Sequence, residues 1–200
     1  MICLGIDPGS RHLGLSVVKD GKFLFVAVAS LKKKEKVNDE IERLSEYLHN
    51  RFGRFNAVCI ERQMKGNMRR IELYLEKAFE RFSRAVIIVA PQSIKRYFNF
   101  SGVKSYKMRK DLAVQIFLRL CKETGQYDSI FKRVAKAPTK IDDAADASLI
   151  AYYGYTESTM LLEKKKKKKK PVNLTEWGKD RMWFVTDVPA VPVSKKRKLS

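Results

Sequence analysis

The chain begins Met1-Ile2-Cys3-Leu4-Gly5-Ile6-Asp7-Pro8-Gly9-Ser10, an apolar run that ends in a carboxylate and a turn. A short apolar run bounded by turn residues is typical of a buried strand, so we expect residues 2–7 to form one. Asp7 then stands at the end of that strand, where burial of its charge is costly unless a counter-charge offsets it. The plainer interpretation is a turn-forming aspartate ahead of Pro8 and Gly9.

Two other segments carry acids in comparable positions. Glu61 ends the apolar run 57–60, and Asp143 and Asp146 open a helix-like stretch. Residues three apart lie on one face of a helix, so both aspartates can reach the same ion. Glu61 could instead be a salt-bridged strand end, and Asp143 could cap a helix. The recurrence of the pattern in three segments favours a shared site.

Asp7, Glu61, Asp143 and Asp146 are therefore predicted to bind metal and to be catalytic. Oxygen ligands without a nearby Cys or His cluster suit Mg²⁺ or Mn²⁺ rather than zinc. Two such ions about 3.5–4 Å apart can activate a water and stabilise the leaving oxygen in phosphodiester hydrolysis. We interpret Asp142 as the residue that precedes the helix.

The charge of the chain indicates the class of substrate. Lys and Arg number 42 against 22 Asp and Glu, which gives a formal net charge of +20. An acidic site in a strongly basic chain indicates a polyanionic substrate, most simply nucleic acid. Residues 157–200 hold 13 of the basic residues against 5 acids, and both this segment and residues 1–156 should bind polyanion.

The same change in composition suggests the domain organisation. We expect a nuclease domain over residues 1–156 and a basic, flexible tail over residues 157–200. The run Lys164–Lys170 is expected to be a disordered, non-specific DNA tether, and residues 195–198 resemble a nuclear-import signal. No apolar run is long enough to cross a bilayer, and the three cysteines read as core residues in a reducing compartment, so we expect an intracellular protein.

The order of the expected elements indicates an α/β fold. Strands are predicted over 2–7, 14–19, 22–29, 57–61 and 85–90, and helices over 37–52, 68–82, 106–122 and 143–153. Asp20-Gly21 is a strong hairpin signal, so the first three strands should form an antiparallel meander. The helix 37–52 should return the chain to a strand parallel to the first, which makes the sheet mixed.

Three motifs together resemble the RuvC family of Holliday-junction resolvases. They are Ile6-Asp7-Pro8-Gly9-Ser10-Arg11 followed by Gly14, Ile60-Glu61, and Asp143-Ala144-Ala145-Asp146-Ala147, and the resemblance spans residues 1 to about 155. The length and the lysine-bearing extension look closer to the resolvases of large DNA viruses, such as poxviruses and iridoviruses. The resemblance implies a ribonuclease H-like fold with flanking helices, a homodimer, magnesium dependence and paired nicks in a four-way DNA junction, in the nucleus or at a viral replication site.

The resemblance also bears on DNA contacts. Lys95 and Lys107 fall near the family's DNA-contacting basic positions. After the second catalytic strand the bacterial enzyme has an aromatic residue that meets junction bases, whereas this chain has Glu61-Arg62-Gln63-Met64.

Further basic residues are expected to meet the DNA backbone. Lys65, Arg69 and Arg70 follow Glu61 closely and would meet phosphates that pass the site. Arg109 and Lys110, with Lys107, begin an amphipathic helix and could also form a merely solvated face.

Other functions remain possible from the sequence. Another ribonuclease H-like nuclease, acting on RNA–DNA hybrids or transposon ends, would share the acidic site. A non-enzymatic DNA-binding protein would account for the charge and leave the acids unexplained. An actin-like ATPase would need a second glycine-rich phosphate loop, and none follows.

Overall fold

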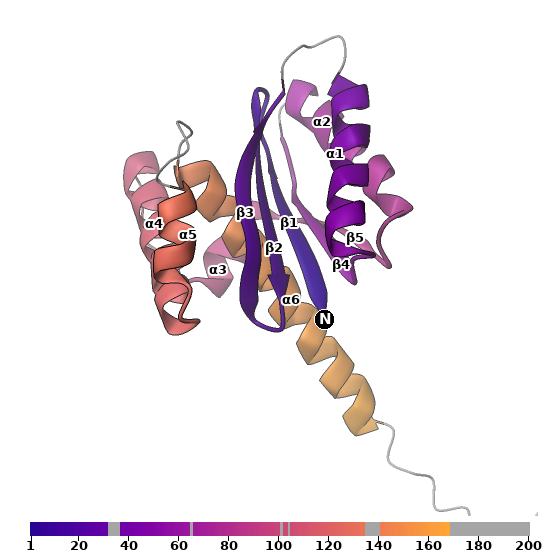
Figure 1. Ribbon diagram of the computed structural model, residues 1–200. Helices are drawn as coiled ribbons and strands as arrows, with labels where there is room; N and C mark the ends of the chain where they lie inside the picture. Colours follow the sequence, from indigo (N-terminus) through magenta and orange to yellow (C-terminus); the bar gives the residue numbers. More distant parts are fainter. Residues whose placement is uncertain (32–36, 65, 101, 104, 135–140, 169–200) are drawn as a thin grey trace, which may run out of the picture.

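A five-stranded sheet lies between two layers of helices in the computed structural model, which describes residues 1–31, 37–64, 66–100, 102–103, 105–134 and 141–168 (Figure 1). The strands are β1 (Ile2–Pro8), β2 (His12–Lys19), β3 (Lys22–Ser30), β4 (Ala57–Glu61) and β5 (Val86–Val89). The helices are α1 (Val37–Phe52), α2 (Gly66–Glu80), α3 (Pro91–Tyr97), α4 (Tyr106–Glu123), α5 (Tyr127–Val134) and α6 (Ile141–Lys168).

The sheet is mixed, as the sequence predicts. Its strand order is β3-β2-β1-β4-β5: β2 is antiparallel to both of its neighbours, β1 and β3, and β4 and β5 run parallel to β1. Asp20 and Gly21, at φ values of 50° and 78°, form the tight turn of the β2–β3 hairpin. Positive φ at both central residues matches the twist of the paired strands, so this dipeptide fixes the meander.

The two faces of the sheet are covered by different helices. Leu4 and Ile6 of β1 belong to the core beneath α1 and α2, whereas Cys3 belongs to the core beneath α4 and α6. Successive side chains of a strand point to opposite faces, so Asp7 shares the α6 face with Cys3. Cys59 of β4 lies in the same core, and the same alternation directs Glu61 to that face.

Helix α6 crosses the sheet in close contact with it (Figure 1). A Cβ atom on Gly5 would lie 2.3 Å from the backbone nitrogen of Ala151, and one on Gly14 would lie 2.1 Å from the carbonyl oxygen of Asp143. Neither position has room for a side chain. The two glycines therefore let the backbone of α6 rest directly on β1 and β2.

Three features differ from the sequence-based expectation. Helices α3 and α5 were not predicted, because at 7 and 8 residues they are too short to show a clear apolar period. Helix α6 begins at Ile141, so Asp142 lies inside its first turn rather than before it.

The third difference is the length of α6. This helix runs to Lys168, so the predicted domain boundary at 157 falls within it, and Lys164–Lys168 are helical rather than disordered. Glu and Lys are good helix formers, which explains the continuation. Residues 169–200, including the import-like residues 195–198, lie outside the described residues. Among the described helices, none is long and apolar enough to span a membrane.

The contact at Gly14 yields a stability prediction. Gly14→Ala should lower the thermal unfolding midpoint by several degrees, because the new Cβ would meet the Asp143 carbonyl and overpacking of this kind costs about 1–3 kcal/mol. Gly66→Ala is the matched control, since nothing lies within 4 Å of a Cβ there. A Gly14→Ala variant as stable as the Gly66→Ala variant would show that α6 does not rest on β2 as described.

Candidate active site

One cavity of about 410 Å³ gathers all four predicted acids. Asp7, Glu61, Asp143 and Asp146 line it, from β1, β4 and α6. The rest of the wall is formed by Pro8, Gly9, Pro91, Ile94, Lys95, Phe100, Tyr106, Arg109, Lys110 and Leu149. The cavity therefore combines a cluster of carboxylates with three basic side chains.

The parallel pairing of β1 and β4 brings two of the acids together. Ile6 pairs with Ile60, so Asp7 and Glu61 are the next residues on neighbouring strands. Both point to the α6 face by the alternation described above. The ends of two adjacent strands thus present carboxylates side by side, as the sequence indicates.

The first turns of α6 supply the other two acids. Asp143 and Asp146 are three residues apart and both reach the cavity from one face of the helix. The close contact between Gly14 and the Asp143 carbonyl fixes the start of α6 against β2, and Gly14 itself pairs with Asp7 in the sheet. Helix packing therefore sets how far these acids lie from the strand acids.

The shared cavity perturbs the acids electrostatically. Burial raises the pKa of Asp7 well above its ordinary value, and the charges of Glu61, Asp146 and Asp143 raise it further. Burial also raises the pKa of Glu61, against the lowering effect of a hydrogen bond from Gln63. Burial, opposed by Lys110 and assisted by the other acids, raises the pKa of Asp146 to about 7. The basic side chains nearby therefore offset only part of the negative charge of the cluster.

Lys110 supplies part of the counter-charge. Its ammonium donates a hydrogen bond to Asp142 Oδ2 and lies 3.8 Å from Asp143 Oδ1. Burial alone lowers the pKa of Lys110, but hydrogen bonds with Asp142 and Tyr106 raise it above the ordinary value. Asp142 is therefore a helix residue that holds this lysine, a contact that no local sequence pattern indicates.

The donor set fits a hard divalent cation. All four acids offer oxygen, and the raised pKa values of Asp7, Glu61 and Asp146 show that a further positive charge at the cavity would be stabilising. Within the ranges that the structure describes, no three Asp, Glu, His or Cys side chains already stand in an arrangement that could hold a metal ion.

The predicted basic residues separate into three groups. Lys95, Arg109 and Lys110 line the acidic cavity. Lys107 lines only a neighbouring cavity, together with Tyr106, Lys110, Asp111, Val114, Ile141 and Asp142, so Lys110 borders both. Arg69 and Arg70, on α2, line neither: Arg69 forms an ion pair with Glu72, and Arg70 donates a hydrogen bond to Tyr74. Lys65 lies outside the described residues.

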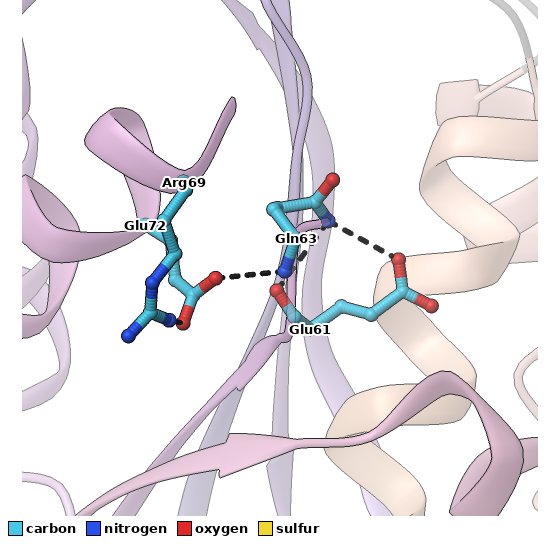
Figure 2. Close-up of polar contacts among 4 residues, drawn as sticks. All are labelled: Glu61, Gln63, Arg69 and Glu72. Carbon is cyan, nitrogen blue, oxygen red and sulfur yellow. Dashed lines mark hydrogen bonds and ion pairs between the residues drawn. The ribbon is translucent and has the colours of Figure 1, made fainter. Parts of the chain in front are cut away.

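Two further polar residues, Gln63 and Glu72, are linked to Glu61 by hydrogen bonds, and neither was predicted to belong to the site. Gln63 Nε2 lies 3.3 Å from Glu61 Oε2, and the backbone N–H of Gln63 donates to Glu72 (Figure 2). Glu72 could have been noticed, because it interrupts the apolar stripe of α2, where an unpaired charge is rarely tolerated. Met64 follows Gln63 and is 88% exposed.

The sequence model of the Poxvirus A22 protein family matches residues 1–156. The chain belongs to this family. The predicted viral branch of the resolvases is thereby confirmed. A search of curated proteins finds no match.

Solved structures confirm the predicted ribonuclease H-like fold of the RuvC type. The crystal structure of the Fowlpox virus resolvase with its substrate Holliday junction DNA superposes with a TM-score of 0.59 at 20% identity, over 80% of this chain and 99% of that one. RuvC of Thermus thermophilus gives a TM-score of 0.55 at 22% identity in its complex with a Holliday junction substrate, and 0.52 at 23% in a second structure. Each covers 80% of this chain and 96% of that one.

The raised pKa of Asp146 predicts how stability depends on pH. A folded-state pKa of about 7 means that the native state binds this proton more tightly than the unfolded chain, whose aspartate pKa is about 3.9. The stabilisation is complete below the unfolded value and is lost as the pH rises through about 7. In chelator, Asp146→Asn should therefore match the wild type near pH 4 and unfold at a higher temperature near pH 8.

Thermal unfolding from pH 4 to 9 measures this difference. Asp111→Asn, with an exposed side chain, is the control and should follow the wild type throughout. Identical midpoints for Asp146→Asn and wild type at pH 8 would show that Asp146 is not buried among like charges.

Proposed function

We propose that the chain is a structure-selective DNA endonuclease that resolves four-way (Holliday) junctions by metal-dependent hydrolysis of paired phosphodiesters. The observation that carries the proposal is the single cavity in which Asp7, Glu61, Asp143 and Asp146 meet three basic side chains. The Fowlpox virus resolvase, which has the same fold, is known in complex with its Holliday junction substrate. Membership of the poxvirus family supports the same assignment.

Asp7, Glu61, Asp143 and Asp146 would hold Mg²⁺, with two ions per site and Mn²⁺ able to substitute. Bound ions would supply Lewis acidity and an activated water at the scissile phosphate. The acids orient this assembly, and their mutual repulsion makes the site dependent on added positive charge.

The basic residues of the cavity contact the DNA backbone. Lys95, Arg109 and Lys110 lie where a phosphate that approaches the acids would pass. Lys110 also keeps Asp142 and Asp143 near its ammonium, so it links the DNA-binding and acidic parts of the site. Such contacts position the strand without reading its sequence.

Resolution requires two nicks, and the described part of each chain has one cavity that gathers the four acids. A homodimer would present two sites to a junction and cut both strands in one encounter. Residues 1–156 would carry the chemistry, and the basic residues 157–200 would add sequence-independent affinity for DNA. The protein would act inside the infected cell, at the site of viral DNA replication.

Cleavage of a synthetic mobile four-way junction tests the proposal. With Mg²⁺ the wild type should give symmetric nicks, and Asp7→Asn, Glu61→Gln and Asp146→Asn should each lower the cleavage rate at least 100-fold while the junction Kd stays within about threefold. The acids hold metal and the basic surface holds DNA, so cleavage and binding should separate.

An RNA–DNA hybrid, a linear duplex and a chelator control accompany that assay. Preferred cutting of the hybrid would replace the proposal with a general ribonuclease H-like activity. Absence of cutting with either Mg²⁺ or Mn²⁺ would contradict it.

A further inference from the structure

Helix α2 carries a carboxylate in an apolar setting. The side chain of Glu72 is fully buried and shares the inner face of the helix with Ile71, Leu75 and Phe79. A charge removed from water in this way is tolerated only when its oxygens find strong partners. Glu72 therefore needs an explanation beyond packing.

Both oxygens of Glu72 are occupied. Oε2 accepts a hydrogen bond of 2.7 Å from the backbone N–H of Gln63, and Oε1 forms an ion pair with Arg69 one turn earlier on the helix (Figure 2). The Arg69 side chain is 45% exposed, so its charge stands at the surface while its partner is inside. The ion pair with Arg69 compensates for the burial of the Glu72 carboxylate, which can therefore stay charged and accept a hydrogen bond.

The acceptor lies where the sheet ends. The backbone N–H of Arg62 still donates to the Val89 carbonyl, at 2.8 Å, as part of the β4–β5 edge. The backbone N–H of the next residue, Gln63, donates to the Glu72 side chain instead of to a neighbouring strand. Glu72 thus holds the backbone in place beyond the end of β4, at Gln63, where a loop would otherwise begin.

The residue held in this way, Gln63, also contacts Glu61 through its side chain. Gln63 Nε2 lies 3.3 Å from Glu61 Oε2 and 3.4 Å from the Glu61 carbonyl oxygen, and Figure 2 shows the Gln63 side chain between Glu72 and Glu61. A chain of contacts therefore runs from Arg69 through Glu72 and Gln63 to an acid of the cavity. It reaches that acid from the opposite side of the sheet to α6.

We propose that Glu72 is a positioning residue, which acts through Gln63 to hold the Glu61 carboxylate toward the cavity, with Arg69 as its counter-ion. The inference rests on the proposed function, because it assigns Glu61 to a metal-dependent site. It also gives Arg69 a role other than the phosphate contact expected from the sequence. Groups that orient a metal ligand typically change metal affinity or activity by about 10–100-fold when they are altered.

Two substitutions isolate the two steps. Glu72→Gln keeps the shape, but its amide can accept from only one of Gln63 and Arg69 and presents an NH₂ group to the other. Gln63→Ala removes the side-chain contact with Glu61 and keeps the backbone N–H that Glu72 binds. Glu80→Gln, an exposed acid on the same helix, is the matched control.

The first readout is metal binding without cleavage. The rise in unfolding midpoint on titration with Mn²⁺ should require about tenfold more metal in Glu72→Gln and Gln63→Ala than in wild type or Glu80→Gln. The double variant should resemble the worse single variant, because both residues act on the same carboxylate. This titration does not depend on which DNA the protein cuts.

The second readout is cleavage at saturating junction DNA. Both variants should show a lower single-turnover rate that excess Mg²⁺ partly restores, with the junction Kd unchanged. If the wild type does not cut junctions, the proposed function fails while the metal titration still decides the role of Glu72. If Glu72→Gln lowers only the unfolding midpoint and keeps the wild-type metal response, Glu72 is merely structural and the inference is overturned.

Discussion

The rest of the structure depends on the contact between the backbone of α6 and the sheet. Gly5 and Gly14 leave no space for a Cβ between the strands and the helix. The small residues Ala147 and Ala151 of α6 meet these glycines and are buried. Because the helix can rest directly on β1 and β2, its first turns lie beside the strand ends, and acids distant in sequence share one cavity.

The resulting cluster concentrates negative charge. Two basic side chains, one on each side of the sheet, form ion pairs with acids in the cluster or next to it. Lys110 of α4 approaches from the α6 side and contacts Asp142 and Asp143. Arg69 of α2 lies on the other side and neutralises Glu72, the group that holds Gln63. The site is therefore supported from both faces of the sheet. A strongly basic chain can carry such a cluster and still attract a polyanion.

Local patterns were sufficient to predict much of this arrangement. The apolar runs before Asp7 and Glu61 indicated buried strands, and Asp20-Gly21 indicated the hairpin, because each signal depends on neighbouring residues alone. The four acids were selected for a similar reason, since each stands at the end of a strand or in the first turns of a helix. The structure brings them to one cavity.

Contacts between distant segments could not be predicted in this way. Lys110 and Asp142 are 32 residues apart, and only the packing of α4 against α6 shows that they meet. Glu72 interrupts the apolar stripe of α2, but its partner on the segment after β4 depends on how α2 packs against the sheet, which no local pattern shows. The separation of Lys107 from the cavity likewise depends on which face of α4 points inward.

The central claim is that close packing of α6 makes one divalent-metal site from three separate segments. Anomalous diffraction from crystals soaked in Mn²⁺ tests it most directly. We expect manganese within coordination distance of Asp7 and of at least one of Asp143 and Asp146, with weaker occupancy in a Gly14→Ala crystal. Manganese bound elsewhere, with the four carboxylates unoccupied under conditions that support cleavage, would contradict the account.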